Sequence, residues 1–319
     1  STVGIAGTFT PGSGVHIITG STVDFNGAGA QTIPAINYNN LTSSNTGART
    51  LANAGTIGIA GVFTPGTNVY TVTGSTISFN GAGAQTVPQF NYNNLTIANT
   101  HGANPVTLVN GGTIGIAGTF TPGTSVFTIT GNTINFNGAG GQTIPAFNYN
   151  NLTSSSTGAR TLVNGGTIGI AGIFTPGTNV YTITGNTIDF NGAGAQTIPA
   201  FNYNNLTISG NRAVAITLGN GNVGVAGIFN PRVTGNTWTP NAANTVVFNG
   251  AAAQTIPAFA FFNGLTLNNA AGANLAGNVT VGNALTLTNG VLGVGTNTLT
   301  LNGAASATAG SLTSSPTGT

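Results

Sequence analysis

The sequence predicts an all-β protein of repetitive architecture, a β-solenoid or β-helix. Two observations lead to this fold class. The string GIAG begins at Gly4, Gly58, Gly115 and Gly169 and returns as GVAG at Gly224, so a repeat of about 54–57 residues occurs five times. Within each copy, apolar residues alternate with small or polar ones, which is the two-residue period of a strand. A tandem array of β-sandwiches is the alternative, and a five-bladed propeller is another.

We number the copies one to five from these glycines. Each copy also contains a second repeated string, which is FNGAGAQTIPAFNYNNLT at 190–207. This string recurs nearly unchanged at 25–42, 79–96 and 136–153, and in an altered form at 248–266. Insertions fall at 97–106 and 230–244, which are rich in Gly, Pro and Asn. These two segments are expected to be loops that project from a fixed frame.

Turn residues separate the strand-like pieces of each copy. The strings TPG, TGN or TGS, and the NG that follows each Phe favour backbone with positive φ, and the Pro of TIPA indicates a corner. About six short strands are expected per copy, arranged in two or three coils. We expect identical positions to stack from copy to copy, with Phe on Phe inside and Asn on Asn at the corners.

The repeat changes character near its C-terminal end. Residues 1–277 form the five-copy array, whereas 278–319 carry a shorter repeat, NALTLTNG at 283–290 and TNTLTLNG at 296–303. We interpret 278–319 as divergent β coils that form a cap or a segment joining subunits.

The composition excludes several classes of function. Only 2% of residues are charged, with four Arg and two Asp, so no basic patch exists for nucleic acid. The absence of Cys excludes disulfides and thiolate metal sites. The joint absence of Lys, Glu, Cys and Met favours a secreted, extracellular or cell-surface protein, and no apolar run is long enough to span a membrane.

The internal copies serve as controls for catalytic residues. Asp24 corresponds to Ser78, Asn135, Asp189 and Val247, so it lies at a turn or surface position rather than acting as a base. Paired-carboxylate chemistry and clustered metal ligands are missing. We therefore predict no enzyme activity, no cofactor and no metal site.

The basic residues show no catalytic pattern either. The residues His16 and His101 are predicted to be surface histidines, and Arg49 and Arg160 align in TGARTL without a predictable acidic partner. The Gly-rich string GAGAQT lacks the Lys and the helix of a phosphate loop.

Two sets of side chains are candidates for binding or modification. The first is a set of glycosylation sequons, each of which could equally be a turn Asn: Asn40, Asn94, Asn151, Asn205 and Asn278. The second is the loop of Trp238, a possible ligand loop, together with tyrosines that recur in phase and either contact glycans or form a stack: Tyr38, Tyr92, Tyr149 and Tyr203.

The two ends of the chain match one phase of the repeat. Residues 312–319 resemble 152–159, and residues 1–12 resemble 112–123. The sequence therefore predicts head-to-tail self-assembly, with strand addition, through Ser1, Thr2, Val3, Leu312, Thr313 and Thr319. A section of a longer repeating polypeptide is the alternative explanation.

Through FNGAGAQTIPAFNYNNLT and LTLTNG…NTLTLNG, the chain resembles secreted bacterial β-strand-repeat surface proteins, which are adhesin-like and broadly filamentous-haemagglutinin-like. The resemblance covers about residues 1–303 and implies a β-solenoid with a structural or adhesive role. The leading hypothesis is a subunit of an extracellular filament or sheath whose main partner is itself, with glycans or neighbouring filaments as further partners. The alternatives are a surface adhesin or carbohydrate-binding module and, less favoured, an ice-binding solenoid with pairs such as Thr128 and Thr130.

Overall fold

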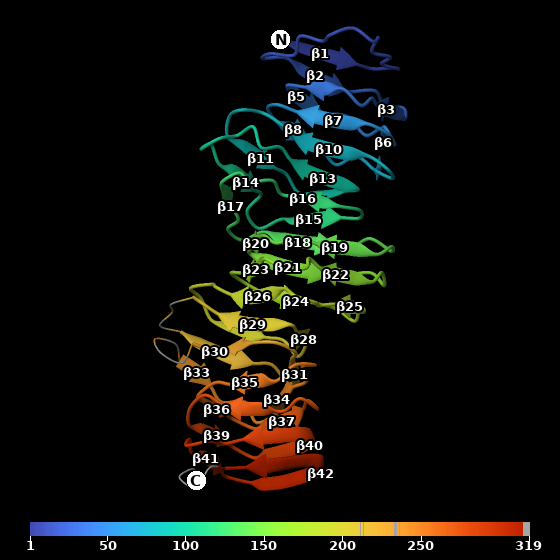
Figure 1. Cartoon of the computed structure of the whole chain (residues 1–319). Helices are drawn as coiled ribbons and strands as arrows, with labels where there is room; N and C mark the ends of the chain where they lie inside the picture. The colour runs from blue at the N-terminus through green and yellow to red at the C-terminus, as the bar shows by residue number, and fades with distance from the viewer. Residues whose placement is uncertain (211, 213, 233–234, 236, 315–319) are drawn as a thin grey trace. The chain divides into compact units, whose positions relative to one another are not determined.

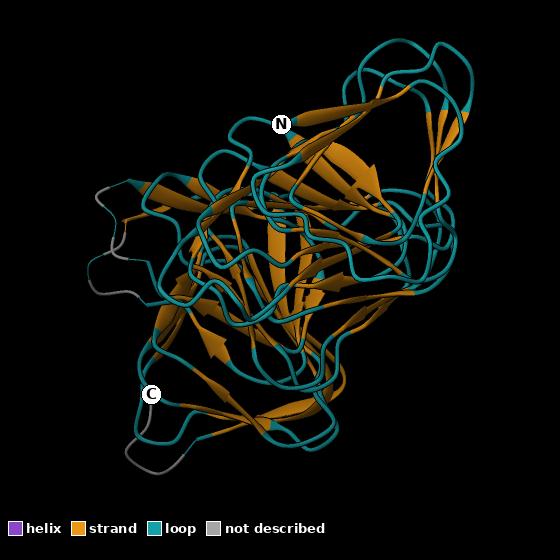
Figure 2. Ribbon diagram, turned by 90° about the horizontal axis from the view of Figure 1, so that it is seen from above, coloured by secondary structure: helices purple, strands orange, loops and turns teal. Residues whose placement is uncertain are grey.

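A computed structural model describes all residues except 211, 213, 233–234, 236 and 315–319. The described residues form strands and loops and contain no helix (Figure 2). The strands are short and pair in parallel, and each successive pairing advances the chain by one turn. The predicted all-β solenoid is therefore confirmed.

The chain divides into two compact units. Unit 1 comprises residues 1–145, 150–161 and 177–181, and unit 2 comprises 146–149, 162–176 and 182–319. In both units nearly every ladder joins strands that are three apart in chain order, so one turn supplies one strand to each of three faces. Each turn takes roughly 18–25 residues, as in Thr56↔Thr76, Thr76↔Asn94 and Leu95↔Phe120.

The strands of unit 1 occupy the three faces in order (Figure 1, blue to green). The first face holds β1 (Thr2–Ile5), β2 (Thr22–Phe25), β5 (Asn40–Thr42), β8 (Phe63–Thr64), β11 (Gln85–Val87), β14 (Val106–Leu108) and β17 (Phe127–Thr128). The second holds β3 (Gln31–Ile33), β6 (Arg49–Leu51), β9 (Tyr70–Thr71), β12 (Phe90–Tyr92), β15 (Thr113–Ile116), β18 (Thr133–Phe136) and β21 (Asn151–Ser154). The third holds β4 (Asn37–Tyr38), β7 (Thr56–Ile59), β10 (Thr76–Phe79), β13 (Asn94–Ile97), β16 (Phe120–Thr121) and β19 (Gln142–Ile144).

Unit 2 repeats this arrangement. One face holds β20 (Asn148–Tyr149), β23 (Thr167–Ile170), β26 (Thr187–Phe190), β29 (Asn205–Ile208), β32 (Phe229–Asn230), β35 (Gln254–Ile256) and β38 (Ala273–Leu275). A second face holds β24 (Phe174–Thr175), β27 (Gln196–Ile198), β30 (Ala215–Leu218), β33 (Thr237–Thr239), β36 (Phe259–Phe261), β39 (Val279–Val281) and β41 (Leu299–Leu301). The third face holds β28 (Asn202–Tyr203), β31 (Gly221–Val225), β34 (Asn244–Phe248), β37 (Gly264–Asn268), β40 (Ala284–Gly293) and β42 (Ala304–Thr313). Strands β22 (Arg160–Leu162) and β25 (Tyr181–Thr182) contribute residues to both units.

The sequence repeat is not a whole number of turns. Copies two and three each contain eight strands, β7–β14 and β15–β22, instead of the six expected. Because a turn has three strands, a copy ends two strands into its third turn. The TIGI strand therefore changes face between copies, from the sheet of β4–β7–β10–β13–β16 in copy two to that of β12–β15–β18–β21 in copy three.

The expectation that identical positions stack is wrong, because ladder neighbours lie one turn of roughly 18–25 residues apart, whereas the copies are 54–57 residues apart. Phe79 of copy two lies between Ile59 and Ile97 in the ladder, not on another FNG phenylalanine. Phe136 likewise pairs with Ile116 and Ser154. Stacking therefore requires compatible residues at different positions of the repeat, and this is why Ile, Leu and Phe alternate along one core column.

The interior of each unit is filled by apolar side chains, as period-two alternation predicts. Ile77 and Phe79 of β10 are 1% and 0% exposed. The corner proline of copy two follows β11, the fifth strand of that copy, and Tyr92 Oη donates a hydrogen bond to Pro88 O at 3.2 Å. This contact ties the corner to the aromatic core.

Glycines have two separate roles in the turns. Gly66 of TPG and Gly74 of TGS adopt φ of 66° and 75°, as predicted for tight turns. The NG after each Phe does not require positive φ, contrary to expectation. A Cβ at Gly27 would lie 2.2 Å from Ala6 O, so this position is glycine because the preceding turn approaches closely.

Candidate functional site

A buried glutamine joins neighbouring turns in every copy. In copy two, Gln85 Nε2 donates to Ile59 O at 2.9 Å and to Gly61 O at 2.7 Å, while Gln85 Oε1 accepts from Gly81 N at 3.0 Å. The same three contacts recur at the other members of this set: Gln31, Gln142, Gln196 and Gln254. The Gln of GAGAQT therefore clamps one turn of each copy to the turn before it.

A second buried polar side chain lies on the turn that follows the glutamine and donates hydrogen bonds to nearby backbone carbonyl groups. Arg49 is fully buried, and its Nη2 donates to Phe25 O at 2.7 Å, Gly27 O at 3.1 Å and Ser44 O at 2.9 Å. Arg160 makes the equivalent contacts in copy three, whereas the buried side chains of His101, Arg212 and Asn269 in the other copies bond to the Oε1 atom of the clamp glutamine. Backbone carbonyls, not carboxylates, hold the Arg49 charge, because aligned carbonyl oxygens supply negative potential.

Histidine takes the place of arginine in copy two. His101 is 1% exposed, so the prediction of a surface histidine was wrong here, although His16 is exposed as expected. His101 Nδ1 lies 3.0 Å from Ala98 O, and Nε2 lies 2.8 Å from Gln85 Oε1. Both partners accept hydrogen bonds, because the other end of the Gln85 amide faces two carbonyl oxygens. The ring therefore joins Gln85 to the loop that follows β13, with one ring nitrogen at each contact.

Burial affects the arginines of this set. It lowers the pKa of Arg160 from its usual value, and Tyr181 partly opposes the shift. It also lowers the pKa of Arg212, where Asp189 opposes it. Arginine stays protonated in proteins, so the buried guanidinium groups of Arg160 and Arg212 remain charged.

An amide bridge crosses the glycine of the GIAG strand in copies two, three and four. Asn80 Nδ2 donates to Asn37 Oδ1 at 3.1 Å across Gly58, joining turns 43 residues apart in sequence. A Cβ at Gly58 would lie 1.9 Å from Asn37 Oδ1, so only glycine fits beneath the bridge. Asn137–Asn91 and Asn191–Asn148 form the same bridge in later copies.

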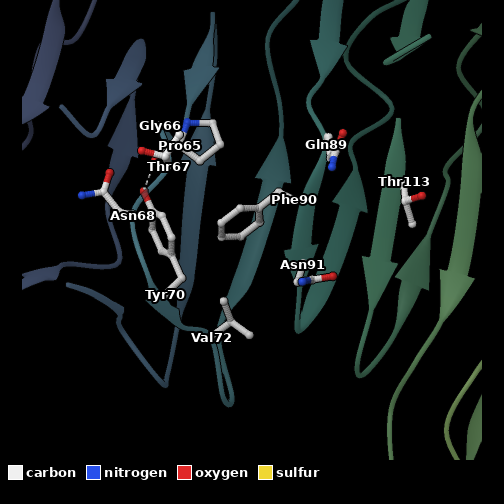
Figure 3. A pocket seen from close by; sticks show the side chains of 10 residues that line it. All are labelled: Pro65, Gly66, Thr67, Asn68, Tyr70, Val72, Gln89, Phe90, Asn91 and Thr113. Atoms are coloured by element: carbon white, nitrogen blue, oxygen red, sulfur yellow. Dashed lines mark hydrogen bonds between the residues drawn. The ribbon is translucent and has the colours of Figure 1, made fainter. Parts of the chain in front are cut away.

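A cleft opens on the second face of unit 1, where the ladder is interrupted. Strand β9 ends the sheet β3–β6–β9, and β12 begins the next sheet on that face. Between them lies a pocket of about 510 Å³ (Figure 3). Its lining is Pro65, Gly66, Thr67, Asn68, Tyr70, Val72, Gln89, Phe90, Asn91 and Thr113.

The aromatic wall of this cleft belongs to a series that the sequence analysis missed. Tyr70 corresponds in the repeat to His16, Phe127, Tyr181 and Trp238, so an aromatic ring or a histidine occupies this position in all five copies. The signal was the residue after Val in GVH, NVY and SVF. It was obscured because four residue types share the position.

The aromatic residues proposed as ligand contacts lie elsewhere. Tyr38, Tyr92, Tyr149 and Tyr203 are at most 1% exposed, so they are core side chains. Burial raises the pKa of all four above the ordinary tyrosine value. Trp238 is half-buried, and its ring packs edge-on against Phe259 with centroids 5.0 Å apart.

The sequon asparagines are engaged in the ladder. Asn40 Nδ2 donates to Thr22 Oγ1 at 3.2 Å and its Oδ1 accepts from Val62 N at 2.9 Å. Asn94 and Asn205 bond in the same way, Asn151 Nδ2 donates to Asn132 O, and Asn278 Oδ1 accepts from Thr298 N. These contacts account for the in-phase NLT string, and glycosylation stays a prediction.

Four of the predicted assembly residues lie in β1 and β42. Thr2 and Val3 pair with Thr22 and Val23, and Leu312 and Thr313 of β42 pair with β40. Ser1 O accepts from Thr22 N, and Thr319 lies outside the described residues.

Across the part of the chain that the structure describes, no three His, Asp or Glu side chains gather as metal ligands. In that same part, no helix is long and apolar enough to cross a membrane. The fold defines the chain as a tandem-repeat β-solenoid protein. Comparison with known protein families, curated proteins and solved structures gives no match.

Proposed function

We propose that this chain is a structural protein, a β-solenoid subunit of an extracellular filament or sheath. One observation carries the proposal: the most repeated polar residues all join one turn to the next. The Gln85 clamp, the buried Arg49 donor and the Asn80–Asn37 amide bridge each join one turn to another. A surface built from such turns accepts a further turn with the same contacts, whether from the same chain or from a second copy.

The charge distribution supports this role. Only 2% of residues are charged, and three of the four Arg residues are buried. The exposed surface therefore carries little net charge. Neutral surfaces do not repel one another, so molecules of this kind associate readily.

The proposed axial contact uses β1 and β42. Val3 is 52% exposed, whereas its counterparts Ile57 and Ile114 are fully buried by neighbouring turns. Leu312 of β42 is 49% exposed. An added turn would bury both side chains, at roughly 25 cal/mol for each Å² of apolar surface removed from water.

Electron microscopy of the purified chain tests the proposal. We expect filaments whose fibre diffraction shows the strand spacing of about 4.8 Å along the axis. The substitutions Val3→Lys and Leu312→Lys should prevent elongation, because each places a charge in the contact. Val69→Lys, at a side chain that is 77% exposed, is the matched control and should leave filaments intact.

A chain that stays monomeric at all concentrations would contradict the proposal. Filaments that survive both lysine substitutions would retain self-assembly but place the contact on another surface.

Secretion and the adhesin-like family type belong to the same proposal. They are supported by the resemblance of the repeated motifs and by the lack of Lys, Glu, Cys and Met. Detection of the native protein in the extracellular fraction of its source cells tests this part.

Ice binding is less well supported by the threonine pattern. Thr32, Thr50 and Thr71 form one outward column across β3, β6 and β9. Two residues further along, the positions hold Pro34, Ala52 and Thr73, so a second column is not formed. A measurement of thermal hysteresis checks this candidate.

A further inference from the structure

The cleft between β9 and β12 is a consequence of the fold in copy two. Strand β9 contains only two residues, and its ladder does not continue to β12. The TPG loop bends away before β9, and the FNY segment begins after the Pro88 corner. The gap between the two sheets leaves a concave site of about 510 Å³, within the range of small-molecule sites.

The floor of the cleft is aromatic and rigid. The Tyr70 and Phe90 rings meet edge to face with centroids 4.8 Å apart, and Phe90 also contacts Phe63 at 5.3 Å and Tyr92 at 4.9 Å. Tyr70 and Phe90 remain half-buried, so part of each ring faces the cleft (Figure 3). Tyr70 Oη donates to Pro65 O at 2.9 Å, which fixes the ring.

The rim is polar and uncharged. The exposed side chains of Thr67, Gln89, Asn91 and Thr113 surround the aromatic floor, and none of the lining residues is ionised near neutral pH. Burial raises the pKa of Tyr70 above its ordinary value, although nearby Arg49 opposes the shift. The Arg49 charge itself is enclosed by backbone carbonyls and does not face the cleft.

Gln89 distinguishes this copy from the others. The residue after the corner proline is alanine in the four remaining copies: Ala35, Ala146, Ala200 and Ala258. Gln89 is exposed, and its amide makes no hydrogen bond within the part of the chain that the structure describes. A free amide beside an aromatic floor provides a donor and an acceptor for a ligand.

We propose that this cleft binds one neutral sugar unit of a glycan. The apolar face of a pyranose ring packs on Tyr70 and Phe90, and its hydroxyls bond to Gln89, Asn91 and the threonine hydroxyls. Aromatic surface combined with amides and hydroxyls matches a ligand that has both apolar and polar faces. An anionic sugar is disfavoured, because no cation lines the cleft to offset its desolvation.

The test is isothermal titration calorimetry of the intact chain with defined oligosaccharides. The neutral probes are cellotetraose, chitotetraose and mannotriose, and the anionic probe is sialyllactose. We expect at least one neutral probe to bind with one site per chain and sialyllactose to bind more weakly. Gln89→Ala and Tyr70→Ala should each weaken binding about tenfold, which is the effect of losing one or two ligand contacts.

The substitutions are chosen to preserve the fold. Alanine occurs naturally at the position of Gln89 in four copies, so Gln89→Ala must fold, and thermal unfolding verifies this for both variants. Thr86→Ala, at an exposed residue outside the cleft, is the control and should bind like the original chain.

Three results would overturn the proposal: no neutral probe binds at millimolar concentration, Gln89→Ala and Tyr70→Ala bind unchanged, or sialyllactose binds best. Filament formation is measured separately, so failure of the cleft proposal leaves the structural proposal intact.

Discussion

At the scale of single residues, the repeated string FNGAGAQTIPAFNYNNLT supplies contacts between turns of the solenoid. Gln, Gly and Asn recur at fixed positions of the repeat because these residues contact a neighbouring turn, as Gln85, Gly58 and Asn80 do. These contacts fill the backbone carbonyls and amides that a loop would otherwise leave buried and unpaired. Substitutions at these residues therefore test the solenoid directly.

Gly58→Ala should destabilise unit 1 by at least about 1 kcal/mol, because the new Cβ would displace the Asn37–Asn80 bridge. Gly83→Ala is the matched control, since a Cβ there has nothing within 4 Å. Urea unfolding of both variants measures the difference. Equal free energies of unfolding would contradict the role assigned to the bridge.

The repeat also predicts which substitutions His101 tolerates. His101→Arg should preserve stability, because Arg212 bonds to Gln196 Oε1 in copy four as His101 bonds to Gln85 Oε1. His101→Leu should cost about 1–3 kcal/mol, because it removes the ring contacts to Gln85 Oε1 and Ala98 O from a buried site. Urea unfolding of both variants distinguishes a required donor from simple filling of space.

At the scale of elements, strand length decides where the surface is closed and where it is open. The four-residue strands β7 and β10 belong to a continuous five-stranded sheet, whereas β8 and β9 have two residues and end their sheets. The cleft lies at such an end. The short strand β9 thus leaves the opening beside Tyr70 and Phe90.

Ile77→Ala in β10 should cost about 2–5 kcal/mol, because the side chain is 1% exposed and its removal leaves a cavity. Val69→Ala beside β9, at 77% exposure, should change stability by less than about 0.5 kcal/mol. Thermal or urea unfolding compares the two. A small effect at Ile77 would mean that the core of unit 1 is less tightly packed than the ladder indicates.

At the scale of the whole chain, the buried tyrosines set the response to alkaline pH. Burial raises the pKa of Tyr92 and Tyr203 well above the ordinary value near 10, one in each unit. The folded state therefore binds these protons more tightly than the unfolded state. Stability is fully present below about pH 10 and falls as pH rises beyond it.

Urea unfolding at pH 8 and pH 11 should show this loss, and phenolate absorbance should appear together with unfolding. Tyr92→Phe should reduce the pH dependence of unit 1, at the cost of the bond to Pro88 O. Ionisation of all tyrosines without unfolding would contradict the buried positions.

The sequence by itself determined the strands, the corners and the repeat. Alternation fixes which side chains face inward, since strand side chains point to opposite faces, and Pro and Gly fix where strands end. Tyr92, for example, could be either a stacked or an exposed residue from its phase alone, but Ile77 and Phe79 could only be core.

Only the tertiary structure decided what touches what between turns. A copy spans more than two turns and each ladder joins adjacent turns, so Phe79 meets Ile59 and Ile97 instead of the Phe of another copy. Adjacent turns also bring His101 to Gln85, and the broken ladder exposes Tyr70 and Phe90 beside Gln89. The sequence repeat gives the number of residues in a copy. The contacts between turns depend on the number of residues in one turn, and three-dimensional packing sets that number.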